Sequence, residues 1–281
     1  MPFLRKRRVV AILIVALVPL VVLLVVPLVR SIKIIVMKIK KIVGAINQNS
    51  METTNMFLEK MKLSDILEKN PQLILTLPRF NIGLGFGEQS VKRVCEKNNI
   101  SVSLFLLICN VYTYKNYLPS VETLVSLDGR ALIDYLQASH DYYFNKRLRH
   151  IEGHIERIAD HCGETGVELK KFFAEYRQEV ESHFYKEESV VFPYIISLLR
   201  GVSHKRIIIE DYLKEHTNVE DKLNDLTNII VKYLPPHILP EERISVWFDL
   251  IQVYQDMNTH AKIEEKILVP YVRILESRKN G

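Results

Sequence analysis

Cysteine is scarce in this chain, and its placement excludes two classes of small protein. Among 281 residues there are three cysteines, Cys95, Cys109 and Cys162, which are far apart and form no CxxC motif. Neither a disulfide framework nor a zinc ribbon is therefore indicated, and a reducing compartment is the simpler inference. With 48% hydrophobic and 25% charged residues, the chain is also neither disordered nor fibrous, and a globular protein with a real core is expected.

Acidic residues are missing from the start of the chain, where the first is Glu52. The net charge of +5 comes largely from this stretch, and the remainder is close to neutral, so the charge does not indicate a nucleic-acid partner. The glycines at positions 83, 85 and 87 are interpreted as a turn, because no strand precedes them and no lysine follows in the register of a phosphate-binding loop. We predict no nucleic-acid partner.

Residues 1–50 form a basic and apolar leader. Its apolar run at 9–29 is interrupted only by Pro19 and Pro27 and is long enough to cross a bilayer core of about 30 Å. The run is too long for a signal peptide and lacks a cleavage motif. The sequence thus predicts a single-pass membrane anchor, with the longer basic side and the bulk of the chain in the cytoplasm. The alternative is a cytoplasmic protein without this leader, translated from one of three internal methionines, Met51, Met56 or Met61.

A motif in the second half of the chain occurs twice. The segment HFYKEESVVFP, which begins at His183, recurs as HAKIEEKILVP, which begins at His260. In a helix, residues four apart lie on one face, so each histidine is presented together with Glu187 or Glu264. Each copy therefore offers an imidazole and a carboxylate in one direction, as a metal site requires.

Each copy is preceded, at a similar distance, by another histidine on a helical segment, His140 or His216. Apolar periodicity and breakers predict four helices, at about 130–160, 167–199, 206–233 and 241–276. We expect an all-α protein in which an antiparallel up-down-up-down four-helix bundle at 127–278 follows a small helical domain at 62–117 and the N-terminal apolar helix. Such a bundle would bring all six side chains to one interior point. Pro193 and Pro270 predict a kink or break just beyond the motifs.

The predicted ligands suit iron. Imidazole binds iron, zinc, copper and nickel, whereas carboxylates are harder ligands that can bridge two cations. A structural zinc site would be closed by four ligands, often including cysteine, and no cysteine is in register. We therefore predict two non-haem iron ions, bridged by Glu187 and Glu264.

These residues resemble those of hemerythrin-like (HHE cation-binding) proteins, and in particular the di-iron proteins for repair of iron centres. The resemblance spans the bundle and implies an oxo- and carboxylate-bridged iron pair held by His140, His183, Glu187, His216, His260 and Glu264. It also implies a supporting role near the site for Glu179 and Glu215. The chain departs from the family where two adjacent cysteines are expected, because Gly85 and Phe86 stand there. Thiol chemistry is therefore in doubt, and Cys95 is interpreted as a buried helix residue.

Three other histidines are not predicted to be ligands. An unbroken helix would separate His140 from His161 by about 30 Å, so His161 is placed near the following turn. His150 and His154 are interpreted as solvated or hydrogen-bonding side chains.

The resemblance implies repair or protection of iron–sulfur or other iron centres under nitrosative or oxidative stress, with iron–sulfur proteins as acceptors. Such a protein binds or donates metal rather than acting as a conventional enzyme. Two alternatives stay open: a sensor or carrier of O2 or NO, and a metal-free interaction module. A membrane would be a partner only through the leader.

Overall fold

The computed structural model describes residues 56–202, 207 and 216–280, which fold into helices joined by turns. Among these residues, β pairing is limited to an isolated bridge between Lys62 and Ser90. The prediction of an all-α helical protein is confirmed for this part of the chain. The predicted apolar helix at 9–29 lies outside the described residues.

Residues 57–113, called the N-terminal segment below, contain short helices. Serine side chains cap two of them: Ser90 accepts a hydrogen bond from the backbone N–H of Arg93, and Ser101 from that of Leu104. The first helix starts at Leu63 without a side-chain cap. The elements are α2 (Leu63–Lys69), η1 (Pro71–Leu75), η2 (Pro78–Phe80), α3 (Val91–Lys97) and α4 (Val102–Thr113), and α5 (Val121–Val125) follows them.

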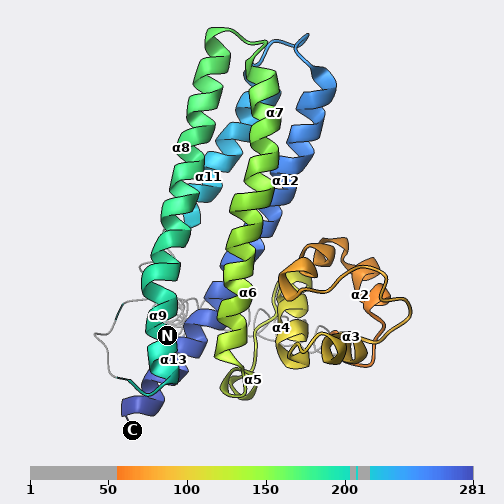
Figure 1. Ribbon diagram of the computed structural model, residues 1–281, viewed down its shortest axis with the longest axis vertical. Helices are drawn as coiled ribbons and strands as arrows, with labels where there is room; N and C mark the ends of the chain where they lie inside the picture. Colours follow the sequence, from red (N-terminus) through yellow and green to blue (C-terminus); the bar gives the residue numbers. More distant parts are fainter. Residues whose placement is uncertain (1–55, 203–206, 208–215, 281) are drawn as a thin grey trace, which may run out of the picture. The chain divides into compact units, whose positions relative to one another are not determined.

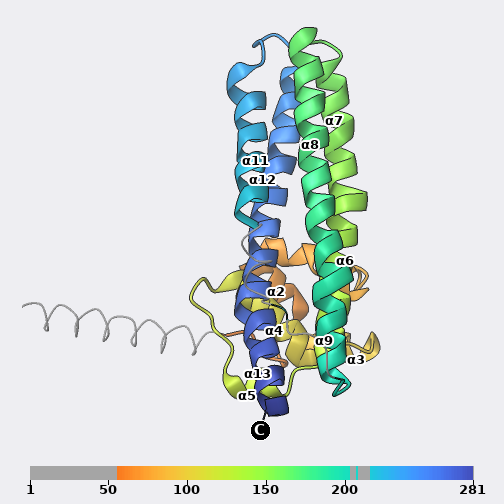
Figure 2. The ribbon, with the colours of Figure 1, turned by 90° about the vertical axis from the view of Figure 1, so that its left-hand side faces the viewer.

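Long helical segments make up the rest of the described chain, and both views show them side by side as a bundle (Figures 1 and 2). Consecutive segments run in alternating directions in Figure 1. Their elements are, in chain order, α6 (Gly129–Asp141), η3 (Tyr142–Leu148) and α7 (Arg149–Ala159); α8 (Glu164–Lys186), η4 (Glu187–Val191) and α9 (Phe192–Leu199); α11 (His216–Asn228) and η5 (Ile229–Tyr233); and α12 (Pro240–Ile263), η6 (Glu264–Leu268) and α13 (Val269–Asn280).

Wide π turns occur at the repeated motif. η4 begins at Glu187 and η6 at Glu264, and each is closed by a backbone hydrogen bond over five residues, in the first copy from the N–H of Phe192 to the carbonyl of Glu187. Pro193 and Pro270 then occupy the second position of α9 and α13. A proline has no N–H to donate, but the first turn of a helix needs none. Where we expected a kink or a break, a π turn therefore lets the helix continue past the proline.

Two hydrophobic clusters fill the described bundle, one on each side of a polar layer. The first cluster also contains the core of the N-terminal segment, whereas the second lies between α7, α8, α11 and α12. Along α8 and η4, the second cluster ends at Phe184 and the first resumes at Val191, with Glu187 between them. His140 and His260 occupy the corresponding places on α6 and α12. The polar layer is thus shielded from water by apolar side chains above and below.

A buried ion pair joins the N-terminal segment to α12. The guanidinium of Arg79 contacts the carboxylate of Asp256, and the two side chains are 1% and 3% exposed. Tyr112 completes the group: its hydroxyl accepts a hydrogen bond from Arg79 Nη1 at 2.7 Å and donates one to Asp256 Oδ1 at 2.7 Å. Burial opposes the charge of Arg79, but the surrounding tyrosines and Asp256 outweigh it, and its pKa is raised well above the usual value.

The prediction of a transmembrane, membrane-anchored protein needs correction. Over residues 56–202, 207 and 216–280, the structure has no helix that is both long and apolar enough to cross a bilayer. The long helices of the bundle carry charged residues on every turn or two, because only one face of each is buried. The prediction was derived from the run at 9–29, which lies outside the described residues.

The buried ion pair leads to a stability prediction. We expect Arg79→Met to lower the free energy of unfolding by about 3–5 kcal/mol, because Asp256 would be left as an uncompensated buried charge. The double variant Arg79→Met/Asp256→Leu should recover most of this loss, since no charge then remains buried. Urea denaturation of both variants measures the difference. Lys62→Met removes the exposed pair with Glu88 and serves as the control, which should leave the midpoint unchanged.

Candidate metal centre

Two histidines and two glutamates converge in the polar layer of the bundle. Ligand atoms of His140, Glu187, His260 and Glu264 all lie within 4.8 Å of one another. The four residues come from three separate segments of the bundle, α6, η4 and α12 with η6. All four are buried, with 1–3% of their surface exposed. Such a group of imidazole nitrogens and carboxylate oxygens is a candidate for metal binding.

The histidine of the first motif copy adjoins this group. His183 Nε2 lies 3.3 Å from Glu187 Oε1, and in the second copy His260 Nε2 lies 3.2 Å from Glu264 Oε1. The structure therefore brings together five of the six predicted ligands. The sixth, His216, is the first residue of α11, but its side chain, like all of Glu215, lies outside what the structure describes.

The electrostatics of the group favour a positive charge at its centre. Burial alone would lower the pKa of His140, but hydrogen bonds to Glu187 and Glu188 outweigh burial and raise this pKa to about 9. His140 Nε2 lies 3.2 Å from both Glu187 Oε2 and His260 Nε2. In the absence of a metal, a proton on His140 thus compensates part of the charge of the carboxylates.

The residues present fit a metal ion. Two ionised carboxylates inside an apolar bundle are costly unless positive charge compensates them, and one proton compensates only one of them. The Nε2 atoms of His140 and His260 face the same point, which suits lone pairs directed at a cation. Imidazole and carboxylate together are typical ligands of first-row transition metals.

Comparison with known proteins identifies the family of this chain. The hemerythrin HHE cation binding domain family matches residues 131–276, which is more than half of the chain and includes every predicted ligand. The chain belongs to this family. Membership of a cation-binding family implies that the domain binds a metal ion.

Two relatives are iron–sulfur cluster repair proteins named ScdA. The protein from Staphylococcus haemolyticus (strain JCSC1435) is 24% identical over 147 residues, and the one from Staphylococcus epidermidis (strain ATCC 12228 / FDA PCI 1200) is 23% identical over 151 residues. Each match covers 50% of this chain and 66% of the relative. The chain thus spans slightly less than two thirds of the length of these relatives.

In this hemerythrin HHE domain, Glu188 contacts His140 on the side of the imidazole ring that faces away from the other ligands. Its Oε1 lies 2.8 Å from His140 Nδ1, and Phe184 stacks on the same imidazole with ring centroids 4.0 Å apart. A ring N–H donated to a carboxylate fixes the tautomer that leaves Nε2 available for a metal. Sequence reasoning missed Glu188, although each motif copy has a second glutamate after the first. In the other copy this residue is Glu265, which is exposed, whereas the 41% exposed side chain of Glu188 still reaches His140.

Glu179 does not lie among the buried ligands. Its partly exposed carboxylate accepts a hydrogen bond from Lys222 on α11. It therefore links α8 to α11, one turn before His183.

The cysteines provide no reactive thiol pair. Cys95 is fully buried in α3, as expected, and burial raises its pKa to about 12. Cys109 is buried as well, and its pKa is raised further by the same cause. A thiol with a raised pKa is a poor nucleophile, because the thiolate is the reactive form. Gly85 has a φ of +91°, where a cysteine would be strained.

The remaining histidines lie where the sequence placed them. His161 is exposed at the turn between α7 and α8, and its Nδ1 lies 2.9 Å from the carbonyl oxygen of Arg157. His150 and His154 take part in hydrogen bonds, as predicted, but the structure also brings them to Asp249 on α12.

Replacing one predicted ligand tests the buried site. We expect Glu264→Gln, which keeps the shape of the side chain, to lose bound iron, because the metal would lack a charged ligand. His161→Ala should keep its iron, since this histidine is exposed at a distant turn. The measurement is the iron content per chain, determined by elemental analysis of the purified variants and the unaltered chain. Equal iron in Glu264→Gln and the unaltered chain would contradict the ligand assignment.

Glu188→Gln tests the support of His140. We expect the affinity for iron to fall by about 10–100-fold, as is typical when the partner of a ligating histidine is lost. Competition with a chelator of known affinity measures this change. Glu265→Gln is the matched control at the exposed position of the second copy and should bind iron as the unaltered chain does.

Proposed function

We propose that this chain is a non-haem di-iron protein that repairs or protects iron–sulfur and other iron centres under nitrosative or oxidative stress. The observation that carries the proposal is the buried group of His140, Glu187, His260 and Glu264 within 4.8 Å. The names of the ScdA relatives support the choice of repair. Each match covers only 66% of the relative, so the repair activity of the relatives supports this proposal without establishing it for this chain.

The proposed ligand set follows the repeat in an antiparallel up-down-up-down bundle. His140, His183, His216 and His260 would each bind one of two iron ions, and the two motif carboxylates, Glu187 and Glu264, would bridge them. When bound, iron supplies redox chemistry and open coordination positions. The chain itself excludes water through the two hydrophobic clusters and orients His140 through Glu188.

A surface groove offers a path to the site. It has a volume of about 320 Å³, lies between α6, η3 and α8, and reaches His140. Phe184 and Glu188, which hold that imidazole, also line the groove. Iron that leaves or enters along this path would pass Glu188, a partly exposed carboxylate suited to receive it.

The same groove supports a second candidate, a carrier or sensor of O2 or NO. The groove has room for a diatomic ligand and is lined by His140 itself. The two candidates differ in the fate of the metal: repair by donation releases iron, whereas reversible ligand binding keeps it.

A transfer assay tests the proposal. The purified chain should contain two iron ions and restore the activity of a hydro-lyase whose iron–sulfur cluster has lost iron. Glu264→Gln, carrying no iron, should not restore it, and the same amount of free iron with a chelator present controls for leakage. A chain that holds iron, restores no activity and binds O2 or NO reversibly would support the second candidate instead. A chain that binds no iron would refute both.

A further inference from the structure

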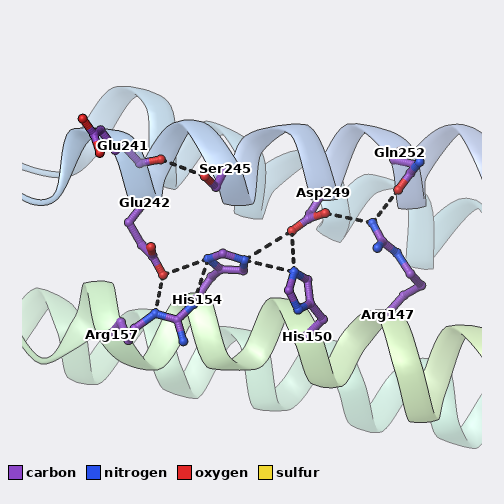
Figure 3. A network of polar contacts seen from close by, with 9 residues as sticks. All are labelled: Arg147, His150, His154, Arg157, Glu241, Glu242, Ser245, Asp249 and Gln252. Atoms are coloured by element: carbon purple, nitrogen blue, oxygen red, sulfur yellow. Dashed lines mark hydrogen bonds and ion pairs between the residues drawn. The ribbon is translucent and has the colours of Figure 1, made fainter.

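A second group of possible metal ligands lies on the outer part of the bundle, between α7 and α12. His150 and His154 are four residues apart on one face of α7 and point toward Asp249 on α12 (Figure 3). Asp249 precedes His260 by 11 residues on the same helix, which corresponds to about 16 Å. The group is therefore separate from the buried site.

The three facing atoms form a nearly equilateral triangle. His150 Nε2 lies 3.2 Å from His154 Nε2 and 3.2 Å from Asp249 Oδ2, and His154 Nε2 lies 3.4 Å from the same oxygen. Zinc bonds to histidine and carboxylate are about 2.0–2.2 Å long, so two ligands of a tetrahedral zinc ion are about 3.3–3.6 Å apart. The edges of the triangle, 3.2–3.4 Å, are close to those of one face of such a tetrahedron.

Neighbouring side chains hold two of the three residues in this orientation. Glu242 Oε1 lies 2.8 Å from His154 Nδ1, and Arg157 Nη2 lies 3.1 Å from the same nitrogen. The carboxylate is nearer and can only accept, so Nδ1 carries the proton and the lone pair of Nε2 faces the triangle. Arg147 donates to Asp249 Oδ1 at 2.9 Å, which leaves Oδ2 for a cation.

Glu242 contacts both His154 and Arg157, and so lies behind the imidazole on the side away from the triangle. A carboxylate behind a ligating histidine is the arrangement that raises the basicity of the ring and fixes its direction.

We propose that His150, His154 and Asp249 form an exchangeable Zn²⁺ site with a fourth position open to solvent. The His150 side chain is 56% exposed, so water reaches the open side of the triangle. Three protein ligands plus water is the ligand count of an open zinc site rather than a closed structural one. Arg147 and Arg157 balance the charges of Asp249 and Glu242, so the protein adds no net negative charge. The zinc is therefore bound reversibly.

Zinc titration of the iron-loaded full chain tests the site. A chromophoric chelator that competes for Zn²⁺ reports both stoichiometry and affinity. The unaltered chain should take up one more Zn²⁺ than Asp249→Asn or His150→Gln. Glu242→Gln should retain the site but bind about 10–100-fold more weakly, because it loses only the support of His154.

His161→Ala provides the matched control. It removes an exposed histidine near the end of the same helix that takes no part in the triangle, and zinc uptake should be unchanged. His150→Gln changes a mostly exposed side chain, so circular dichroism should show an intact fold. Equal zinc uptake by the unaltered chain, Asp249→Asn and His150→Gln would overturn the proposal, and so would an equal loss in His161→Ala. Failure of the buried site to hold iron would leave these comparisons unaffected.

Discussion

Keeping carboxylates charged inside an apolar bundle is the constraint on which this structure depends. Glu187 and Glu264 are 3% and 1% exposed, and each buried charge costs several kcal/mol unless a partner compensates it. The hydrophobic clusters on either side keep water from doing so. Compensation must therefore come from within the layer, from the imidazoles and from a bound cation. This explains why the histidines and glutamates occur together and in both halves of the repeat.

Helix α12 and the η6 turn that follows it contribute an acidic residue to three of the polar groups described above, which are the outer histidine group, the Arg79 ion pair and the buried metal centre. Asp249, Asp256, His260 and Glu264 are spaced by seven, four and four residues, which places them along one face of the helix. Along this face, α12 and η6 meet the histidines of α7, then Arg79 of the N-terminal segment, and then His140 of α6. One helix face thus aligns two candidate metal sites and the contact that holds the N-terminal segment.

The sequence revealed the parts of the site that repeat. His183 with Glu187 and His260 with Glu264 could be recognised because a helix turns a spacing of four into proximity. Contacts between distant residues could not be found in this way: Arg79 and Asp256 are 177 positions apart, and Arg147 and Asp249 are 102 apart. The π turns were missed because apolar periodicity does not distinguish a hydrogen bond over five residues from one over four. The membrane prediction is corrected for the described chain, in which no helix is both long and apolar enough to cross a bilayer; it was derived from the run at 9–29, which lies outside the described residues.

The Arg79–Asp256 pair also couples the evolution of the N-terminal segment to that of the bundle. A gene that encoded the bundle alone would leave Asp256 without its cation, one helical turn before His260. The loss of the N-terminal segment would therefore have to be accompanied by replacement of this aspartate. Bundles of this kind that occur without the segment are expected to carry an uncharged residue at the equivalent of position 256. The residue at this position would then indicate whether the bundle evolved together with an N-terminal segment.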